Sequence, residues 1–265
     1  MYLTINSDEQ CTQLQADLNR LEEWEREWLM EFNPEKCEVL RISRKKTIIY
    51  FDYTLHGKIL RSVKSAKYLG VELSHDLKWN AQIRKTTAKA NRTLGFLKRN
   101  LRVKSCALKQ QAYFSLVRPQ LEYCSSIWDP RQGIENNGSY RLEMVQRRAA
   151  RWTLCRYHPT VSVSDMLQEL GWRSLLQRRC DARLVLLHKI KNGLVACNRD
   201  QLKDPIRRSR HTHDHTIRPI TCKTKSHQLS FFPRTILQWN NIPPDLFVNC
   251  NSSAIFRSRI SNLTH

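Results

Sequence analysis

Glycine is scarce in this chain of 265 residues, with only seven, and the scarcity excludes several classes of nucleotide-binding enzyme. The seven are spaced so that neither a P-loop nor a Gly-x-Gly-x-x-Gly turn, in which backbone amides cradle phosphates, can form. The sequence also lacks His-Glu-x-x-His and Gly-x-Ser-x-Gly, the signatures of common metalloprotease and serine hydrolase centres. None of the nine cysteines forms Cys-x-x-Cys, so neither a zinc ribbon nor a thioredoxin-like motif is predicted.

Long apolar runs are also missing. The most apolar stretch, residues 184–187, lasts four residues, whereas a membrane-spanning helix needs about 20. The first residues carry no basic segment and no long apolar segment, so we expect no secretion signal and an intracellular location in the cytoplasm or nucleus. In that setting the cysteines are predicted to be reduced thiols that serve mostly as small buried hydrophobes.

Acidic residues are few: 24 Asp and Glu stand against 45 Lys and Arg, which gives a net charge of +21. No two aspartates are adjacent, and only 13 acidic residues follow position 60. Two-metal phosphoryl transfer needs carboxylates close enough to hold both ions. We therefore predict no catalytic residue in this chain.

A histidine-rich segment contains His211, His213 and His215, followed by Cys222 and His227. Alternate histidines on a strand share a face, so these side chains have the chemistry of a tetrahedral zinc site. The spacing matches no common zinc module, however, and the segment is basic, which repels a cation. We predict no metal site and interpret the segment as a polar, pH-sensitive loop.

The positive charge is unevenly distributed. Residues 1–60 are slightly acidic, with 8 basic and 11 acidic residues, whereas 61–130 hold 14 against 4. Residues 131–200 hold 13 against 6, and 201–265 hold 10 against 3. An excess spread over about 200 residues indicates a broad basic surface, for which the commonest partner is a polyphosphate such as nucleic acid. A positive surface that only keeps the protein in solution is the alternative.

The front of the chain is predicted to be a helix followed by strands. Residues 8–31 carry apolar side chains at helical spacing, beginning at a Ser7–Gln10 capping box and ending before Pro34. Residues 37–43, 48–55 and 68–73 are predicted strands, with a turn at His56 and Gly57 and a return strand beginning at residue 59. This region is therefore expected to be a small antiparallel meander.

The pattern changes to helices from residue 80. The cleanest periodicity runs over 80–101, where Ile83, Ala90, Leu94 and Leu97 lie on one face. The basic residues Lys85, Lys89, Arg92 and Arg99 fall about 200° away, as a helix that lies along phosphates requires. An ordinary solvated helix face has the same pattern.

Further helices are expected at 108–117, 141–153, 164–170 and 175–192. The first is predicted to end at Arg118-Pro119, and the third to start at an N-cap Ser164 and end at Gly171. Residues 199–230 are predicted to be a basic, His-rich linker. Residues 231–265 are predicted to form short helices that pack on a larger body. The expected fold class is α+β, with a meander, a mainly helical region and an irregular C-terminal extension.

Several blocks occur in an order and spacing that match a known family over nearly the whole chain. They are Leu14-Gln15-Ala16-Asp17-Leu18, Trp24, Trp28, Phe32-Asn33-Pro34-Glu35-Lys36-Cys37, Lys67-Tyr68-Leu69-Gly70-Val71, Leu94-Gly95-Phe96-Leu97-Lys98-Arg99-Asn100-Leu101, Val117-Arg118-Pro119-Gln120-Leu121-Glu122-Tyr123, Gln146-Arg147-Arg148-Ala149-Ala150-Arg151 and Trp239-Asn240-Asn241-Ile242-Pro243. These blocks resemble the reverse transcriptases of non-LTR (LINE) retrotransposons of the jockey-like type.

The resemblance implies the C-terminal part of such an enzyme: a partial palm with the primer-grip hairpin (1–75), a helical thumb-like region (80–198), the linker (199–230) and a C-terminal extension (231–265). In that family the two-aspartate catalytic motif lies immediately before the position of Met1. The resemblance therefore implies a truncated polymerase, inactive alone. It also implies no cofactor in this chain, since Mg²⁺ in the complete enzyme is held by the missing aspartates.

The resemblance also implies which residues approach nucleic acid. The hairpin would meet the primer end, with Gly70 allowing close backbone approach, and the helical region would follow template-primer phosphates. The set is Lys67, Tyr68, Leu69, Gly70, Lys85, Lys89, Arg92, Lys98, Arg99, Arg147, Arg148 and Arg151. Tyr68 and Leu69 as strand core, and the arginines as a solvated helix face, are the alternatives.

The expected partner is an RNA or DNA template-primer, with no membrane. A protein partner at the exposed palm edge is an added prediction, because an incomplete sheet leaves strand edges and apolar surface uncovered. Two rival functions remain open: a helical protein-interaction module, and a retrotransposon relic without a cellular role.

Overall fold

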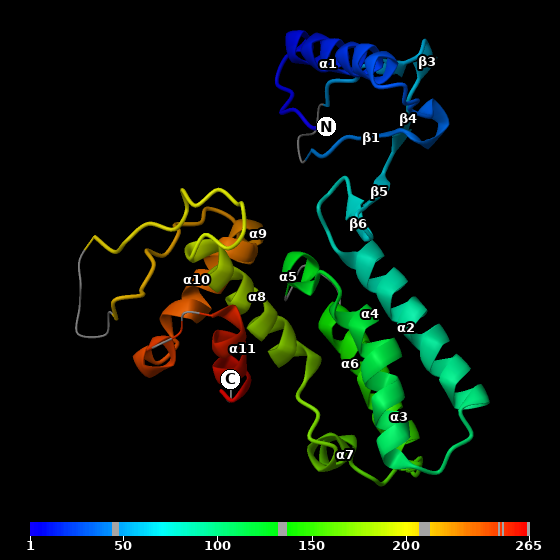
Figure 1. The fold of residues 1–265 in the computed structure, drawn as a ribbon, viewed down its shortest axis with the longest axis vertical. Helices are drawn as coiled ribbons and strands as arrows, with labels where there is room; N and C mark the ends of the chain where they lie inside the picture. Colours follow the sequence, from blue (N-terminus) through cyan, green and yellow to red (C-terminus); the bar gives the residue numbers. More distant parts are fainter. Residues whose placement is uncertain (44–47, 132–136, 207–212, 249, 251, 264–265) are drawn as a thin grey trace. The chain divides into compact units, whose positions relative to one another are not determined.

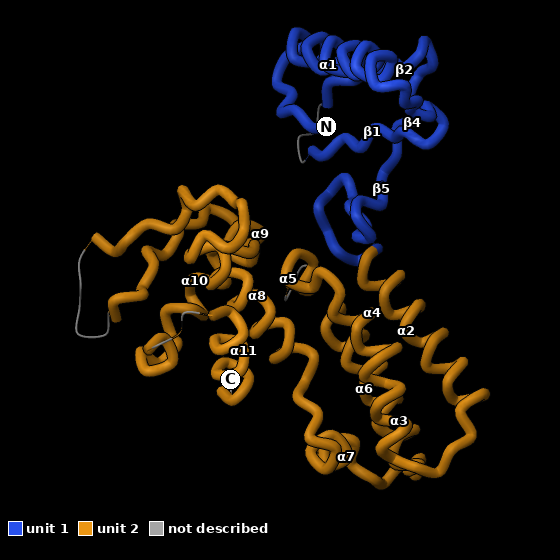
Figure 2. Tube along the Cα trace, in the orientation of Figure 1, with its two compact units in different colours: residues 1–81 blue, residues 82–265 orange. Residues whose placement is uncertain are grey.

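The computed structural model describes residues 1–43, 48–131, 137–206, 213–248, 250 and 252–263 (Figure 1). The chain is 54% helical and 7% strand, which confirms the α+β class. It divides into two compact units, residues 1–81 and 82–265 (Figure 2). Each unit is described by itself below.

Unit 1 begins with the helix α1 (Asp8–Glu27), which is four residues shorter than predicted. The Ser7 side chain makes no capping hydrogen bond, so the predicted capping box is wrong; instead the Asn6 N–H donates to the Gln10 side chain. The helix stops because Leu29 has a left-handed backbone, with φ 50°. Trp28, which follows the last residue of the helix, is 62% exposed.

The strands of unit 1 are shorter than predicted and form three two-stranded sheets. They are β1 (Glu38–Leu40), β2 (Thr54–Leu55), β3 (Lys58–Ile59), β4 (Arg61–Val63), β5 (Ser65–Tyr68) and β6 (Val71–Ser74). The pairs β2–β3 and β5–β6 are antiparallel hairpins, but β1 pairs with β4 in parallel. A continuous antiparallel meander is therefore not formed. The predicted turn at His56 and Gly57 is confirmed between β2 and β3.

The core of unit 1 lies between α1 and the segment around β2. Tyr53, Leu55 and Leu60 are buried there, and Leu14 and Leu18 of α1 pack against them. The Gln15 side chain joins the two parts, because its amide donates to the Thr54 carbonyl at 3.0 Å and its carbonyl accepts from the Thr54 N–H at 2.9 Å.

In the described residues of unit 2, all the regular secondary structure is helical. Its elements are α2 (Asn80–Asn100), α3 (Cys106–Ala112), the π-helical segment η2 (Tyr113–Val117), α4 (Arg118–Glu122), α5 (Ser125–Trp128), α6 (Gly138–Leu154), α7 (Val163–Glu169), α8 (Leu175–Lys191), α9 (Lys225–Gln228), α10 (Phe231–Asn240), the 3-10 turn η3 (Pro244–Phe247) and α11 (Ser253–Ser261) (Figure 1). Unit 1 also contains the short 3-10 turn η1 (Pro34–Lys36), which precedes β1.

Two of the helix ends in unit 2 differ from the predictions. The chain stays helical past Val117, because η2 widens the turn and Pro119 then sits at the start of α4, where a missing N–H costs little. The N-cap of α7 is Ser162, whose hydroxyl accepts from the Asp165 N–H, and not Ser164. Gly171, with φ 64°, follows the end of α7 as predicted.

The C-terminal segment packs onto α8, as expected for short helices resting on a larger body. Leu184, Ile236, Trp239, Phe256 and their neighbours form one buried cluster that draws on α8, α10, η3 and α11. The predicted linker contains α9 and a buried Ile217. Its residues 207–212 lie outside the described part of the chain.

All nine cysteines are without a disulfide partner. The prediction that they serve as small buried hydrophobes is confirmed for two of them only. Cys11 and Cys180 are buried, while Cys155 and Cys197 are exposed and the rest are intermediate.

Candidate nucleic-acid interface

The helix α2 separates its apolar and basic residues onto opposite faces. Ile83, Ala90, Leu94 and Leu97 are buried, which confirms the predicted core face. The four predicted cations of this helix, Lys85, Lys89, Arg92 and Arg99, are all exposed. At 100° per residue they fall within an arc of about 80° on the far side of the helix. We call these four residues the α2 cation row.

Three of the four cations in this row form no ion pair with a carboxylate of the described residues. Among the residues that the structure describes, no ion pair and no hydrogen bond involves the side chains of Lys89, Arg92 or Arg99. The row extends over 14 residues, or about 21 Å at 1.5 Å per residue. It therefore offers a linear set of charges to an extended polyanion.

A second group of cations forms where α2 meets α6. Arg148 donates to the Asn91 side chain at 3.1 Å. Partial burial, and next the charge of Arg148, lower the pKa of Lys98 below its ordinary value. The structure thus brings Lys98 and Arg148 together, although 50 residues separate them in sequence. Two like charges held close together are stabilised when an anion binds between them.

The two other arginines of the predicted set on α6 are rotated away from Arg148 around that helix. Arg147 and Arg151 are four residues apart and lie about 100° and about 60° from Arg148. Arg147 acts electrostatically on Glu143, a carboxyl whose pKa is raised by burial. Arg151 is partly buried, and its Nε has no hydrogen-bond partner among the described residues. Of these three arginines, Arg148 is the one with a hydrogen bond to α2 among the described residues.

The predicted hairpin residues form the tip of the β5–β6 pair in unit 1. Tyr68 pairs with Val71, so Leu69 and Gly70 are the two turn residues, with φ 45° and 84°. Both positive values match a two-residue turn of type I′, in which glycine is favoured. Tyr68 is 65% and Leu69 74% exposed, so neither is strand core. Lys67 is exposed and lies opposite the buried Glu72 in the register.

The arginines of α8 contrast with the α2 cation row. Asp129, 3% exposed, pairs with Arg179 at 2.7 Å, with Arg234 of α10 at 2.8 Å and with Arg183. Arg179 and Arg183 are almost completely buried. Burial, together with the charge of Arg234, lowers the pKa of Arg179 to about 10 and that of Arg183 to about 9. We call these four residues the Asp129 cluster.

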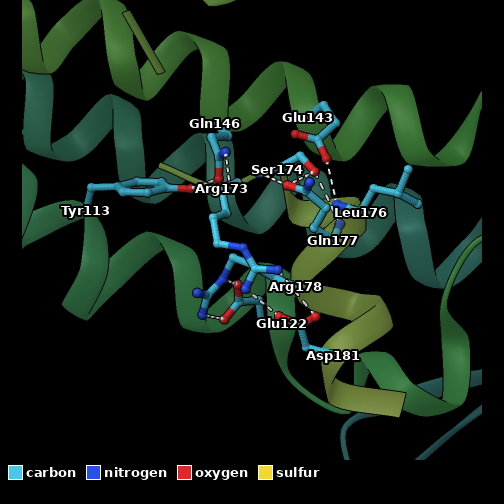
Figure 3. Close-up of polar contacts among 10 residues, drawn as sticks. All are labelled: Tyr113, Glu122, Glu143, Gln146, Arg173, Ser174, Leu176, Gln177, Arg178 and Asp181. Atoms are coloured by element: carbon cyan, nitrogen blue, oxygen red, sulfur yellow. Dashed lines mark hydrogen bonds and ion pairs between the residues drawn. The ribbon is translucent and has the colours of Figure 1, made fainter. Parts of the chain in front are cut away.

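The start of α8 is held by further internal pairs (Figure 3). Arg178 makes a bidentate ion pair with Glu122, and Arg173 pairs with Asp181 at 2.6 Å. Ser174 and Gln177 form a complete capping box. These arginines are paired with carboxylates inside the fold, so they form no free basic surface.

Sequence reasoning missed two features. Phe96 is 57% exposed and lies on the face of the α2 cation row, four residues after Arg92 and three before Arg99. Its helical spacing was the available signal. The Asp129 cluster has no local signal, because its members come from α5, α8 and α10.

Metal-binding side chains do not gather in the described part of the chain. No group of three or more His, Cys, Asp or Glu there has the arrangement of a metal site. His213 and His215 instead pack against Phe247, with ring centroids 5.2 and 4.6 Å apart. His211 lies outside the described residues. The described residues do not fit the Mg²⁺ of a polymerase centre.

The fold and this surface define a class: a basic α+β protein with an outward-facing row of cations. No helix among the described residues is both long and apolar enough to cross a bilayer. No protein family profile matches the chain, and no solved structure matches it.

The sequence is similar to a probable RNA-directed DNA polymerase from transposon BS of Drosophila melanogaster, with 29% identity over 167 residues. The match covers 60% of this chain but 18% of that protein. The chain thus has a distant relation to a reverse transcriptase of a transposon, and it corresponds to a small part of the relative.

Proposed function

We propose that this chain forms the primer grip and the thumb of a reverse transcriptase of the non-LTR, jockey-like type. In that role it binds the template-primer nucleic acid. The distant relation to a transposon RNA-directed DNA polymerase supports the class of enzyme. The α2 cation row supports the role in binding. The helical unit 2 would act as the thumb, and the β5–β6 hairpin as the primer grip.

The observation that carries the proposal is that three cations of the α2 row, Lys89, Arg92 and Arg99, are exposed and form no ion pair within the described residues. Neutralising phosphates with Lys and Arg releases condensed counterions, which drives binding without reading the sequence. Lys98 and Arg148 add a phosphate position where α6 joins α2.

The hairpin is proposed to meet the primer end. Its tip is exposed, and Gly70 has no side chain to hold a ligand away from the backbone. Tyr68, also exposed, offers a ring to a sugar or base, and Lys67 a charge to a phosphate.

Polymerisation itself is assigned to residues outside this chain. The 265 residues contain no adjacent aspartates, and their described part contains no carboxylate group that fits a metal pair. We therefore expect the purified chain to bind a template-primer without adding nucleotides to it. Templated extension by homogeneous material, with Mg²⁺ and all four nucleotides, would contradict this assignment.

The test of binding is a filter-binding titration with a labelled template-primer at several salt concentrations. We expect association that tolerates changes of sequence and weakens steeply as salt rises, because phosphate contacts dominate. Absence of association even at about 50 mM salt would reject the proposal.

One observation favours protein binding as a second function. Trp28, Leu29 and Met30, just after α1, are 62%, 93% and 51% exposed, and such adjoining apolar side chains are typical of an interface. Charge reversal at Lys85, Lys89 and Arg92 distinguishes the functions. It should abolish binding of nucleic acid under the first proposal, whereas capture of a protein partner through Trp28 should survive it.

A further inference from the structure

Phe96 interrupts the α2 cation row. The row has rises of about 6 Å from Lys85 to Lys89 and about 4.5 Å from there to Arg92, but about 10 Å from Arg92 to Arg99. Phe96 occupies this widest gap, on the same face of the helix. The row therefore presents three cations, an aromatic ring and a further cation to whatever binds it.

The ring of Phe96 has no internal partner in the part of the chain that the structure describes. No aromatic ring stacks on it, and no Lys or Arg lies over it. Phe114 of the same unit shows the usual alternative, because the Arg118 guanidinium lies 3.9 Å above its ring and Tyr113 and Trp172 flank it. Phe96 is exposed although an aromatic side chain gains stability from burial.

The position next to Phe96 is also uncrowded. Gly95 is the only glycine within α2, and a methyl group placed on it would meet a single atom within 4 Å, Nη1 of Arg99 at 3.5 Å. The residue before Phe96 thus adds no side chain of its own, and the one neighbouring atom at that position belongs to the Arg99 guanidinium.

We propose that Phe96 stacks on a base of single-stranded nucleic acid, while the α2 cation row holds the phosphates on either side of that base. The inference rests on the proposed function and specifies its substrate: the unpaired stretch of a template-primer. Charge complementarity fixes a polyanion as the occupant, and an exposed ring within the row selects a polyanion with accessible planar faces. Proteins that bind single strands combine a basic track with aromatic stacking residues in this way.

A fully paired duplex fits the same surface less well. Its bases are stacked on one another, so a ring on a helix surface reaches a base face only after a step has been unstacked. An unpaired strand exposes its bases without that cost. RNA and DNA are equally compatible, because stacking uses the π-face that every base has.

The experiment compares Phe96→Ala with the intact protein by fluorescence anisotropy, using an unpaired 20-mer and its blunt duplex. Phe96→Tyr retains an aromatic ring, and Ile255→Ala removes an exposed apolar side chain on α11. A Lys89→Gln, Arg92→Gln double variant reports on phosphate contacts. Circular dichroism and the thermal midpoint verify that each variant is folded.

We expect Phe96→Ala to weaken binding of the single strand about tenfold, within the range for loss of one base–aromatic stack. Binding of the duplex should change less than about twofold, and the salt dependence of single-strand binding should stay the same because no cation is lost. Phe96→Tyr and Ile255→Ala should bind like the intact protein. A single strand carrying one 5-iodouridine should cross-link to the peptide that contains Phe96.

Three other outcomes would overturn the inference, and they can be told apart. If the double variant weakens binding but Phe96→Ala does not, the proposed function survives and the stacking role falls. If Phe96→Ala weakens duplex and single strand equally, Phe96 acts as a wedge or supports the helix, and single-strand selection is rejected. If the intact protein binds neither probe at low salt, the proposed function fails, and the stacking role fails with it.

Discussion

The helices α2 and α8 of unit 2 both carry clustered cations, but the two sets are used differently. On α8, Arg178, Arg179 and Arg183 each meet an internal carboxylate, and two of them are buried. On α2, Lys89 and Arg92 are exposed and have no ion-pair partner among the described residues. The count of 45 Lys and Arg therefore overstates the free basic surface. What distinguishes a binding surface is the lack of internal pairing, which only the fold reveals.

The largest effect is expected at the Asp129 cluster, from Asp129→Asn. The substitution leaves Arg179 and Arg183 buried without a counter-charge, and breaking a buried pair in this way costs about 3–5 kcal/mol. The free energy of unfolding, measured in urea, should fall by that amount. Asp245→Asn is the matched control, because Asp245 is exposed and should change stability by less than about 0.5 kcal/mol. Equal effects of the two variants would show that the cluster is not a structural ion pair.

A smaller loss of stability is expected at the start of α8, from Ser174→Ala. This change removes the hydroxyl that accepts from the Gln177 N–H at 3.2 Å and disrupts the capping box, which costs about 1 kcal/mol. Ser164→Ala is the control, because Ser164 lies inside α7 and caps nothing. Thermal unfolding should show a lower midpoint for the first variant alone. The same midpoint for both would contradict the capping role.

A gain of stability is expected on α2, from Gly95→Ala. Glycine inside a helix is less stable than alanine by about 0.5–1 kcal/mol, and the added methyl group would meet only an ordinary contact at 3.5 Å. Urea unfolding should show the increase, and the affinity for nucleic acid should not change. A destabilised variant would mean that Gly95 needs open space.

The smallest effect is a pH dependence that belongs to Lys98. Burial and Arg148 lower the pKa of Lys98, so this lysine loses its proton at a pH below the ordinary 10.5. A bound phosphate favours the charged form, and the affinity should therefore fall as pH rises through the lowered pKa. We expect a change below about fivefold, as for a surface ion pair. Lys98→Arg should remove the dependence, and a pH profile unaffected by this substitution would exclude Lys98.

The sequence predicts the helices whose core is made by their own periodicity. The expected range 80–101 became α2 (Asn80–Asn100), because Ile83, Ala90 and Leu94 repeat at the spacing of one face. Similarly, 175–192 became α8 (Leu175–Lys191). Elements that depend on distant partners were not predictable: β1 pairs with β4 in parallel across more than 20 residues, and a meander was expected instead.

In the candidate site, too, features that follow from local periodicity were predictable and features that depend on distant partners were not. The exposure of the α2 cation row followed from helical spacing, because residues on the side of a helix opposite its buried face point toward solvent. That Arg148 lies beside Lys98, and that Arg179 and Arg183 share Asp129, depends on how α2, α5, α6 and α8 pack. No local pattern contains that information, since ion pairs between helices are set by tertiary contacts.

The most direct measurement is the slope of log affinity against log salt for Lys89→Gln, Arg92→Gln compared with Arg156→Gln. Arg156 is also exposed but pairs with Glu169, so it serves as a cation that is already neutralised internally. If the α2 cation row holds phosphates, the slope should shrink by about one for each charge removed from the row and stay unchanged for Arg156→Gln. Equal slopes for the intact protein, the double variant and Arg156→Gln would contradict the account.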